Sequence, residues 1–282
     1  MILLVDAGAT KADWIALDQD GNRIFNSQSQ GLSPEVLTRE DIVARLEEKF
    51  DILQNRFSVT DLYFYGAGCG TDRMKNLLTE IFTDFFPNAT ISVKEDTYAA
   101  VFATTPRNEK AIVSILGTGS NCSYFDGETL HQKVQSLGYI AMDDCSGNHF
   151  GKQLIRGYYF GKMPKNLALQ FEQEYDLDAD SIKNNLYKRP NPNAYLATFA
   201  KFLIQHKDND FCQKIIFEAM ESFVENYIKQ FENCHEVPNH FIGSIAFYLK
   251  DELQQVMTKH NLQLGNILRR PIDGLIDYHI TK

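Results

Sequence analysis

The sequence predicts an α/β protein of two domains with related topology, residues 1–108 and 109–282. The first observation is an apolar run that stops at an acid and enters a Gly-Thr turn, Ile2-Leu-Leu-Val-Asp6 followed by Ala7-Gly-Ala-Thr10-Lys11. The second is the return of this pattern at Ala111-Ile-Val-Ser-Ile-Leu116-Gly-Thr-Gly119, again with a further strand and an Asp-Gly turn behind it. A repeated opening of strand, turn and strand predicts two units with one common fold.

The first half reads as three strands followed by alternating helices and strands. Tight Gly turns separate the short β-prone runs 2–6, 14–17 and 23–25, which predicts an antiparallel set. Residues 39–50 carry apolar side chains at the three- and four-residue spacing of an amphipathic helix. Beyond them we expect strand 61–65, helix 74–86, strand 89–93 and helix 98–104.

The second half repeats the opening and then becomes mainly helical. The pattern breaks near Pro106, and strands are expected at 111–116 and 122–125. A late strand at 240–242 meets Gly243, and a helix follows from Phe247. The expected helices between these strands are 150–160, 168–175, 195–205 and 211–231.

Composition excludes several classes of protein. The chain has 282 residues, of which 44% are hydrophobic, and a formal net charge of −9. A basic cluster for a nucleic-acid backbone is missing, so we expect no nucleic-acid partner, although loop amides and a metal ion can still hold an anion such as ATP. No apolar run reaches the length of a membrane span, and no targeting segment is seen. The five dispersed cysteines form no CxxC pair and predict free thiols and a cytoplasmic location.

The first Gly turn is a candidate phosphate site. Asp6 ends a strand, where a carboxylate can hold hydrated Mg²⁺. The glycine turn formed by Gly8, Thr10 and Lys11 would bring backbone N–H groups to phosphate oxygens. A plain β-hairpin with Asp6 in an Asx turn explains the same residues. The spacing alone does not separate the two interpretations.

The second Gly turn carries a stronger pattern. Gly117 and Gly119 bracket Thr118 after a buried strand, and Ser120 and Asn121 follow. Several amides and two hydroxyls would share one small concavity. A tight hairpin is the alternative, but the match to the first turn favours phosphate binding. Neither turn has the GxxxxGK[ST] pattern of a P-loop.

Three acids follow strands or precede helices. Asp96 comes after strand 89–93, where it is either a helix cap or the base that accepts a hydroxyl proton in phosphoryl transfer. Asp143 and Asp144 precede the helix at 150–160. They are either a solvated capping segment or ligands for sugar hydroxyls or a metal.

In this order the motifs resemble the N-acetylglucosamine kinase family. This family is the BadF/BadG/BcrA/BcrD-type ATPase branch of the actin, sugar-kinase and heat-shock chaperone superfamily. The resemblance runs from Ile2 to Tyr278. It rests on Asp6-x-Gly8-x-Thr10, Asp96, Leu116-Gly-Thr-Gly-Ser-Asn121, Asp143-Asp-Cys-Ser-Gly147 and Phe241-Ile-Gly-Ser-Ile-Ala246.

The resemblance implies two ribonuclease-H-like, or actin-like ATPase, domains with a cleft between them. Each would have a mixed five-stranded sheet with helices, and the second would carry extra helices. By motif, Asp6 would hold the metal and Asp96 would be the catalytic acid. The implied nucleotide and phosphate ligands are Gly8, Thr10, Lys11, Gly117, Thr118, Gly119, Ser120, Asn121, Gly243, Ser244 and Ala246.

The resemblance also implies a sugar site, and this chain departs from the family there. Glu35 stands where sugar-binding members carry Asn. Met142 and Cys145 replace two glycines of the family's Gly-Asp-Glu-Gly loop, which places bulk near the expected sugar. The implied substrate-binding residues are Ser33, Glu35, Gly68, Gly138, Asp143 and Asp144.

The expected function is ATP- and Mg²⁺-dependent phosphorylation of an amino sugar. N-acetylglucosamine or a close relative, such as glucosamine or N-acetylmuramic acid, is the expected acceptor, and family habit implies a homodimer. One alternative is an ATPase that activates a partner enzyme through an iron–sulfur cluster, for which Cys69 is the one cysteine in a suitable Gly-rich loop. The other is a sensor that binds sugar or nucleotide without transfer.

Overall fold

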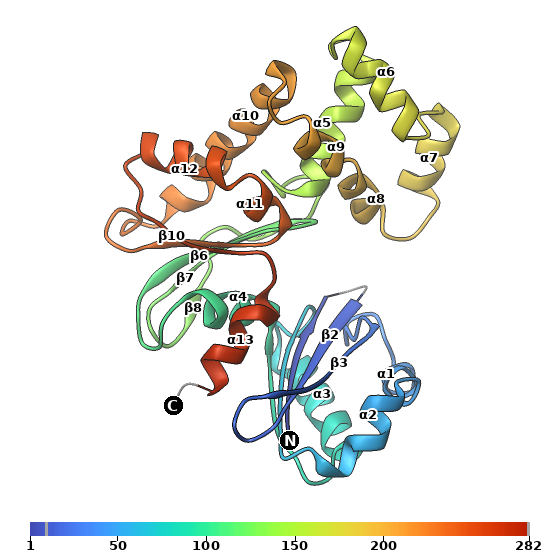
Figure 1. The fold of residues 1–282 in the computed structure, drawn as a ribbon, viewed down its shortest axis with the longest axis vertical. Helices are drawn as coiled ribbons and strands as arrows, with labels where there is room; N and C mark the ends of the chain where they lie inside the picture. Colours follow the sequence, from blue (N-terminus) through green and yellow to red (C-terminus); the bar gives the residue numbers. More distant parts are fainter. Residues whose placement is uncertain (9–10, 281–282) are drawn as a thin grey trace. The chain divides into compact units, whose positions relative to one another are not determined.

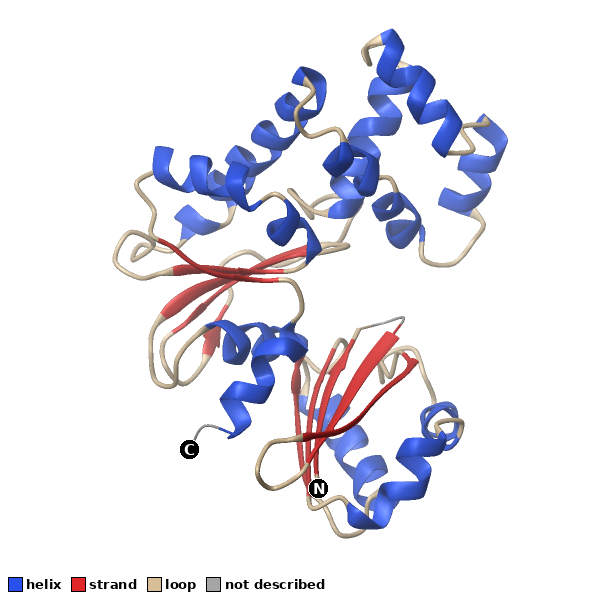
Figure 2. Ribbon diagram, in the orientation of Figure 1, coloured by secondary structure: helices blue, strands red, loops and turns tan. Residues whose placement is uncertain are grey.

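The structure is a computed structural model that describes residues 1–8 and 11–280. Its chain forms two compact units, coloured along the sequence in Figure 1. Unit 1 comprises Met1–Arg107 together with the segment from Arg270 onward, and unit 2 comprises Asn108–Arg269. Each unit contains one mixed five-stranded sheet with helices, which confirms the predicted α/β class (Figure 2).

The sheet of unit 1 has the strand order β3-β2-β1-β4-β5. β2 is antiparallel to both β1 and β3, whereas β4 is parallel to both β1 and β5. The three predicted opening strands are therefore present. The strands are β1 (Ile2–Ala7), β2 (Lys11–Leu17), β3 (Arg23–Gln30), β4 (Asp61–Gly66) and β5 (Thr90–Glu95).

Helices cover both faces of this sheet, which explains why the middle of β1 is apolar without alternation. Leu3 and Val5 point to one face and pack with Phe82 of α3, whereas Leu4 points to the other. Thr38 begins α1 with a capping box, and Thr71 caps α3. The helices within Met1–Arg107 are α1 (Arg39–Glu47), α2 (Phe50–Asn55), the 3₁₀ turn Arg56–Ser58, α3 (Asp72–Phe85) and α4 (Asp96–Thr104).

The C-terminal helix α13 (Pro271–Ile280) belongs to unit 1, whereas the sequence placed these residues in the second domain. Ile272 and Leu275 of α13 are buried against Leu4 of the sheet. Gly274 allows close packing on α4, because a Cβ there would lie 2.4 Å from the carbonyl oxygen of Ala103. The position of α13 in the sequence does not predict this contact, because the contact depends on the apolar face of the unit 1 sheet.

Unit 2 repeats the topology of unit 1. Its strand order, β10-β9-β6-β7-β8, has the same pattern of parallel and antiparallel neighbours. The repeat seen in the sequence is thus a repeat of topology. The strands are β6 (Ala111–Leu116), β7 (Ser120–Phe125), β8 (Leu130–His131), β9 (Asn239–Ile242) and β10 (Leu264–Leu268).

One large apolar core joins this sheet to its helices, with Phe150, Phe202, Phe223 and Phe241 buried in it. Ser146 caps α5 by accepting from the backbone N–H of His149. The helices of unit 2 are α5 (Gly147–Tyr159), α6 (Lys165–Glu174), α7 (Ala179–Tyr187), α8 (Pro192–Thr198), α9 (Ala200–Gln205), α10 (Asp210–Asn226), the 3₁₀ turn Ile228–Gln230, α11 (Ser244–Tyr248) and α12 (Lys250–Lys259).

Two expected helices of unit 2 are interrupted. The helix expected at 195–205 divides at Phe199, whose N–H bonds the Leu196 carbonyl in a tighter turn, while the Thr198 hydroxyl bonds the Tyr195 carbonyl. The helix expected at 211–231 ends at Asn226 and continues as a 3₁₀ turn. Strands β8 and β10 and helix α7 were not predicted.

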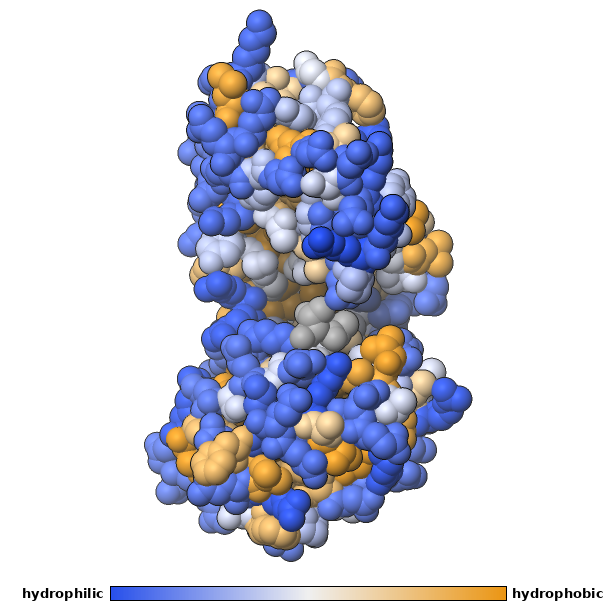
Figure 3. Space-filling model, turned by 90° about the vertical axis from the view of Figure 1, so that its right-hand side faces the viewer, coloured by the Kyte–Doolittle hydropathy of each residue, from blue (hydrophilic) through white to orange (hydrophobic). Residues whose placement is uncertain are grey.

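The face of the chain drawn in Figure 3 is largely polar. In the view of Figure 3, hydrophilic side chains dominate and the hydrophobic ones form small separate patches. Within residues 1–8 and 11–280, each helix is either too short or too polar to cross a lipid bilayer.

Candidate active site

Two carboxylates lie at one edge of the sheet of unit 1. β1, β4 and β5 run parallel, so their carboxyl ends meet at the same edge. Asp6 is the next-to-last residue of β1, and Asp96 is the first residue of α4, directly after β5. The strand order therefore brings together two acids that are 90 positions apart in the sequence (96 − 6).

The surroundings of these acids disfavour their charged forms. Loss of solvent, and then the charges of Asp96 and Asp13, raise the pKa of Asp6 to about 7, against the opposing effect of Lys11. Loss of solvent, and then the charge of Glu95, raise the pKa of Asp96 to about 6, although amides at the start of α4 act in the other direction. The edge therefore holds negative charge that the protein compensates only in part.

The first Gly turn closes next to this edge. The Gly8 N–H donates to the Lys11 carbonyl over 2.8 Å. Thr10, the third ligand expected in this turn, lies outside the described residues. The structure thus describes the two ends of this turn, the predicted phosphate ligands Gly8 and Lys11.

Asp13 adds a third carboxylate, which the sequence did not single out. It lies directly opposite Asp6 on the neighbouring antiparallel strand, so both side chains share one face of the sheet. Its carboxylate pairs with the Lys11 ammonium at 3.0 Å and accepts from the Gln28 amide at 2.8 Å. Two like charges in opposite positions repel each other, which makes this face a favourable place for a cation.

The expected sugar-contact segments of unit 1 lie against one another. Gly68 has a φ of +81°, and a Cβ there would lie 2.4 Å from the Ser33 hydroxyl and 3.3 Å from the Cγ of Glu35. Ser33 is buried and Glu35 is exposed. Loss of solvent, together with nearby charges that include Asp96 and Glu35, raises the pKa of Cys69 to about 12. The loop that contains Gly68 thus lies within electrostatic reach of the candidate base.

The second Gly turn joins β6 to β7 in unit 2. The Gly117 N–H donates to the Gly119 carbonyl over 3.0 Å, and a Cβ on Gly117 would meet no atom within 4 Å. The Ser120 hydroxyl is buried without a hydrogen-bond partner among the described residues. Asn121 lies on β7, where its side-chain oxygen accepts from the hydroxyl of Ser123. The open backbone at Gly117 fits an anionic ligand, whereas the Ser120 hydroxyl is closed to solvent.

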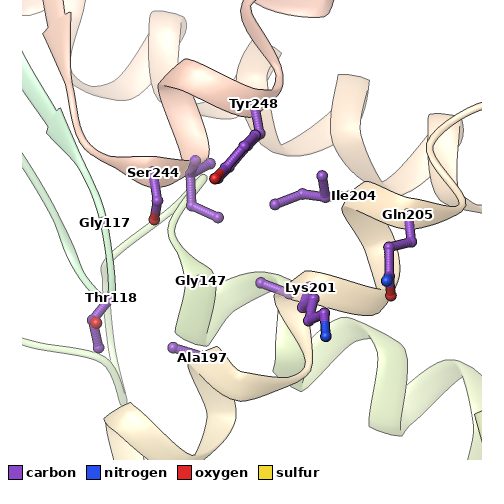
Figure 4. Close-up of a pocket in the computed structure, with 11 residues that line it drawn as sticks. Gly117, Thr118, Gly147, Ala197, Lys201, Ile204, Gln205, Ser244 and Tyr248 are labelled. Carbon is purple, nitrogen blue, oxygen red and sulfur yellow. The ribbon is translucent and has the colours of Figure 1, made fainter. Parts of the chain in front are cut away.

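The turn before α11 packs on this Gly turn. Gly243 has a φ of +119°, and a Cβ there would lie 2.2 Å from the Leu116 carbonyl oxygen. Only glycine permits this approach. Ser244 begins α11 and faces the open space beyond Gly117 (Figure 4). Ala246, which was expected near adenosine, is instead fully buried in the core of unit 2.

A pocket of about 490 Å³ opens beside the two turns (Figure 4). This volume lies in the usual range for small-molecule sites. Aliphatic side chains and a tyrosine ring form most of its wall, and hydroxyl, ammonium and amide groups are placed among them, as a nucleoside requires. The lining residues are Gly117, Thr118, Gly147, Ala197, Ala200, Lys201, Ile204, Gln205, Ser244, Ile245 and Tyr248.

Most of this wall was missed by the sequence reasoning, which named only Gly117, Thr118 and Ser244 of the lining residues as ligands. Ala197, Lys201, Ile204 and Gln205 recur three or four positions apart, which is typical of one helical face. A buried face and a ligand-binding face have the same period, so this spacing does not distinguish the two. Tyr248 is 41% exposed, a property that the sequence does not reveal.

Asp143 lies beneath the second Gly turn. It is buried, and its Oδ2 accepts from the Asn148 amide over 2.9 Å. A Cβ on Gly119 would lie 2.8 Å from the same oxygen. The acid that the resemblance assigned to the sugar therefore supports the turn assigned to phosphate.

Asp144 and Gly138 lie in different surroundings. The carboxylate of Asp144 accepts from the Ser222 hydroxyl at 3.2 Å and lies 3.4 Å from His149 Nδ1. The hydrogen bond to His149 lowers the pKa of Asp144, so its charge is already engaged by protein groups. Gly138 lies in a turn closed by the N–H of Met142, with no atom within 4 Å of its missing side chain.

Cys145 does not fill the expected sugar site. Its side chain is fully buried in the apolar core of unit 2, on a backbone with a φ of +59°. The Met142 sulfur accepts from the backbone N–H of Leu137. The expectation that Cys145 adds bulk near the sugar is wrong, because its side chain points into the core.

The acids of unit 1 suit hydrated magnesium. Among the described residues, no three His, Cys, Asp or Glu side chains are arranged to hold a metal by themselves. Magnesium usually takes one or two carboxylates, several waters and substrate phosphates. Asp6 supplies such an oxygen ligand, and the negative charges of Asp96 and Asp13 act on it more strongly than the opposing charge of Lys11, which favours a cation there. The residues present therefore fit Mg²⁺.

Comparison with known proteins identifies the family. No protein-family model and no curated protein matches the chain. One solved structure, from Porphyromonas gingivalis and described as a candidate N-acetylglucosamine kinase, is 35% identical with a TM-score of 0.93. The match covers 100% of this chain and 99% of that one. The chain belongs to the N-acetylglucosamine kinase family of sugar kinases.

More distant structures share the fold of this family. A candidate N-acetylglucosamine kinase from Chromobacterium violaceum is 15% identical, with a TM-score of 0.70 and 98% of both chains covered. A ROK family glucokinase from Streptomyces griseus, solved with glucose and AMPPNP, is 13% identical. Its TM-score is 0.57, and the match covers 98% of this chain and 97% of that one. The N-acetylglucosamine kinase family thus has the two-domain fold of the actin-like sugar kinases.

Proposed function

We propose that this sugar kinase transfers the γ-phosphoryl group of ATP to a hydroxyl group of an amino sugar. N-acetylglucosamine or a close relative, such as glucosamine or N-acetylmuramic acid, is the proposed acceptor. Family membership at 35% identity supports sugar phosphorylation, and the name of the Porphyromonas gingivalis relative supports the amino-sugar class. Ser33, Glu35 and the Gly68 loop, which lie against one another, would contact the sugar.

The pair of carboxylates at the strand ends of unit 1 carries this proposal. Asp96 would accept the proton of the attacking hydroxyl, because phosphoryl transfer needs one base that also orients the acceptor oxygen. Its pKa of about 6 leaves the side chain mostly ionised at neutral pH and still basic enough to take a proton. Asp6 would hold the hydrated metal.

Magnesium and the Gly turns would handle the phosphates. A bound Mg²⁺ would neutralise the charge of the β- and γ-phosphates. In unit 1, Lys11 and the Gly8 amide are the proposed phosphate ligands. In unit 2, backbone amides of the turn 117–119 would donate to phosphate oxygens, and the pocket beside them would take the adenosine.

A coupled assay of ADP release tests the proposal. Purified protein with MgATP is given amino sugars, plain hexoses or no sugar. We expect ADP release only with a sugar, and fastest with an amino sugar. Sugar-dependent thermal stabilisation without ADP release would instead favour the sensor hypothesis. Turnover that ignores every sugar would overturn the proposal.

The activator hypothesis receives no support from Cys69. Its side chain is fully buried, and a pKa raised to about 12 disfavours the thiolate that an iron–sulfur cluster needs. An absorbance scan of protein purified without oxygen would detect such a cluster. The cytoplasmic location and the homodimer remain predictions.

A further inference from the structure

A buried amide holds the second Gly turn from behind. Asn148 is fully buried, and its Nδ2 donates to the Thr118 carbonyl over 2.7 Å and to Asp143 Oδ2 over 2.9 Å. Its backbone N–H also donates to the Thr118 carbonyl, over 3.0 Å. Asn148 thus donates two hydrogen bonds to the Thr118 carbonyl in the middle of the turn and connects the turn to the Asp143 carboxylate.

Asp143 supports the other side of the turn. Its Oδ2 lies 2.8 Å from the position that a Cβ on Gly119 would take, so the carboxylate packs directly against the backbone there. Asp143 has a φ of +66°, a strained conformation for a residue with a side chain. Such a conformation persists only where surrounding contacts enforce it, and here the Asn148 amide supplies one.

The opposite side of the turn is open. Gly117 and Thr118 line the pocket, and nothing lies within 4 Å of the missing side chain of Gly117. The network is therefore behind the turn, and the ligand space is in front of it. Turn amides bind an anion well only if their direction is fixed before the ligand arrives.

We infer that Asp143 and Asn148 are positioning residues that hold the turn 117–119 in the conformation that binds the phosphates of the nucleotide. This inference rests on the proposed function and moves Asp143 from the sugar to the nucleotide. Both residues act through backbone groups of the turn and need not touch the ligand. Their loss should weaken nucleotide binding and leave the Michaelis constant for sugar unchanged.

Asn148→Ala in the full chain tests the inference, with MgATP binding measured by titration calorimetry. We expect MgATP to bind at least about tenfold more weakly, which corresponds to about 1.4 kcal/mol. The KM for ATP should rise similarly, while the KM for sugar stays within about twofold. Equal MgATP affinity in the wild type and the variant would overturn the inference.

Asn239→Ala is a matched control. Asn239 is also fully buried in unit 2, its amide donates to the carbonyls of Cys234 and Val237, and its Oδ1, like that of Asn148, has no partner among the described residues. Both substitutions remove similar core hydrogen bonds, so a general loss of stability would appear in both. Weaker MgATP binding in the control as well would indicate a merely structural effect and refute the assignment.

Asp143 supplies a second test if Asn148→Ala folds poorly. Asp143→Asn keeps an acceptor for the Asn148 amide and should bind MgATP within about threefold of the wild type. Asp143→Ala should lose affinity. A rise in the KM for sugar alone would show that Asp143 serves the sugar and would overturn the inference. A wild-type chain that binds no MgATP would overturn the proposed function and the inference with it.

Discussion

Replacing Asp96 by asparagine should separate chemistry from nucleotide binding. With a pKa of about 6, Asp96 is mostly ionised at pH 7.5. Asparagine keeps the shape of the side chain but cannot accept the hydroxyl proton. Loss of a positioned general base lowers kcat by about 10²–10⁴-fold. We expect a loss of this size in the assay of ADP release.

The same substitution should preserve binding of MgATP. The charge of Asp96 is one cause of the raised pKa of Asp6. Its removal therefore lowers the pKa of Asp6, and more of the Asp6 carboxylate is free to hold the metal at neutral pH. The loss of the Asp96 charge also weakens the attraction for the cation, so the two effects oppose each other. Calorimetry should show MgATP binding within about threefold of the wild type.

Glu95→Gln is the matched control for this experiment. It removes one negative charge from the neighbouring residue but leaves the candidate base in place. We expect its kcat to stay within about tenfold of the wild type. The reasoning fails if Asp96→Asn keeps kcat within about threefold, or if Asp96→Asn and Glu95→Gln lose activity equally.

Three further predictions concern other parts of the chain. Gly243→Ala should lower the free energy of unfolding by about 2–4 kcal/mol in urea, because its Cβ would lie 2.2 Å from the Leu116 carbonyl oxygen at a φ of +119°; an unchanged midpoint would contradict the geometry. Tyr248→Ala should raise the KM for ATP about tenfold at constant kcat, because the tyrosine ring in the pocket wall is lost. An unchanged KM would show that the adenine ring binds elsewhere. Burial lowers the pKa of His279 to about 4, so the unfolded chain binds the extra proton and stability falls as the pH drops below about 6.5. His279→Gln should remove about 1–2 kcal/mol of the loss between pH 7 and 5 in urea titrations, and an equal acid sensitivity in both proteins would refute this assignment.

Much of the fold could be predicted from the sequence, because strands, turns and their boundaries leave patterns in short stretches of the chain. The Gly-Thr turns after 2–6 and 111–116 marked the start of each repeat, and both sheets have the expected mixed topology. Acids at strand ends were also visible, because strand boundaries are local. The meeting of Asp6 and Asp96 at one edge follows from the parallel order of β1, β4 and β5, which was not predicted from the sequence.

Other parts of the site depend on contacts that no local pattern contains. In the sequence, Asp13 looks like any other polar residue of an alternating strand. Its position opposite Asp6 follows only from the pairing register of β1 and β2. The pocket wall on α9 has the spacing of a packing face, and the break at Phe199 that exposes it was not predicted. The packing of α13 on unit 1 depends on an apolar sheet face whose residues come from separate parts of the sequence and form one surface only in the folded chain.

One departure of this chain from its family, Cys145 in place of a glycine, lies at a position of positive φ in the 142–147 loop, as does Asp143, which matches the family's Asp. Asp143 and Cys145 both have positive φ values, 66° and 59°, a conformation that glycine adopts without strain. Two side chains there cost free energy, which their contacts must offset. Cys145 is buried in the apolar core, and Asp143 bonds Asn148 beneath the Gly turn. The side chains of Asp143 and Cys145 therefore anchor the 142–147 loop. The strained backbone at Asp143 lies directly behind the turn 117–119, whose amides would bind the phosphates.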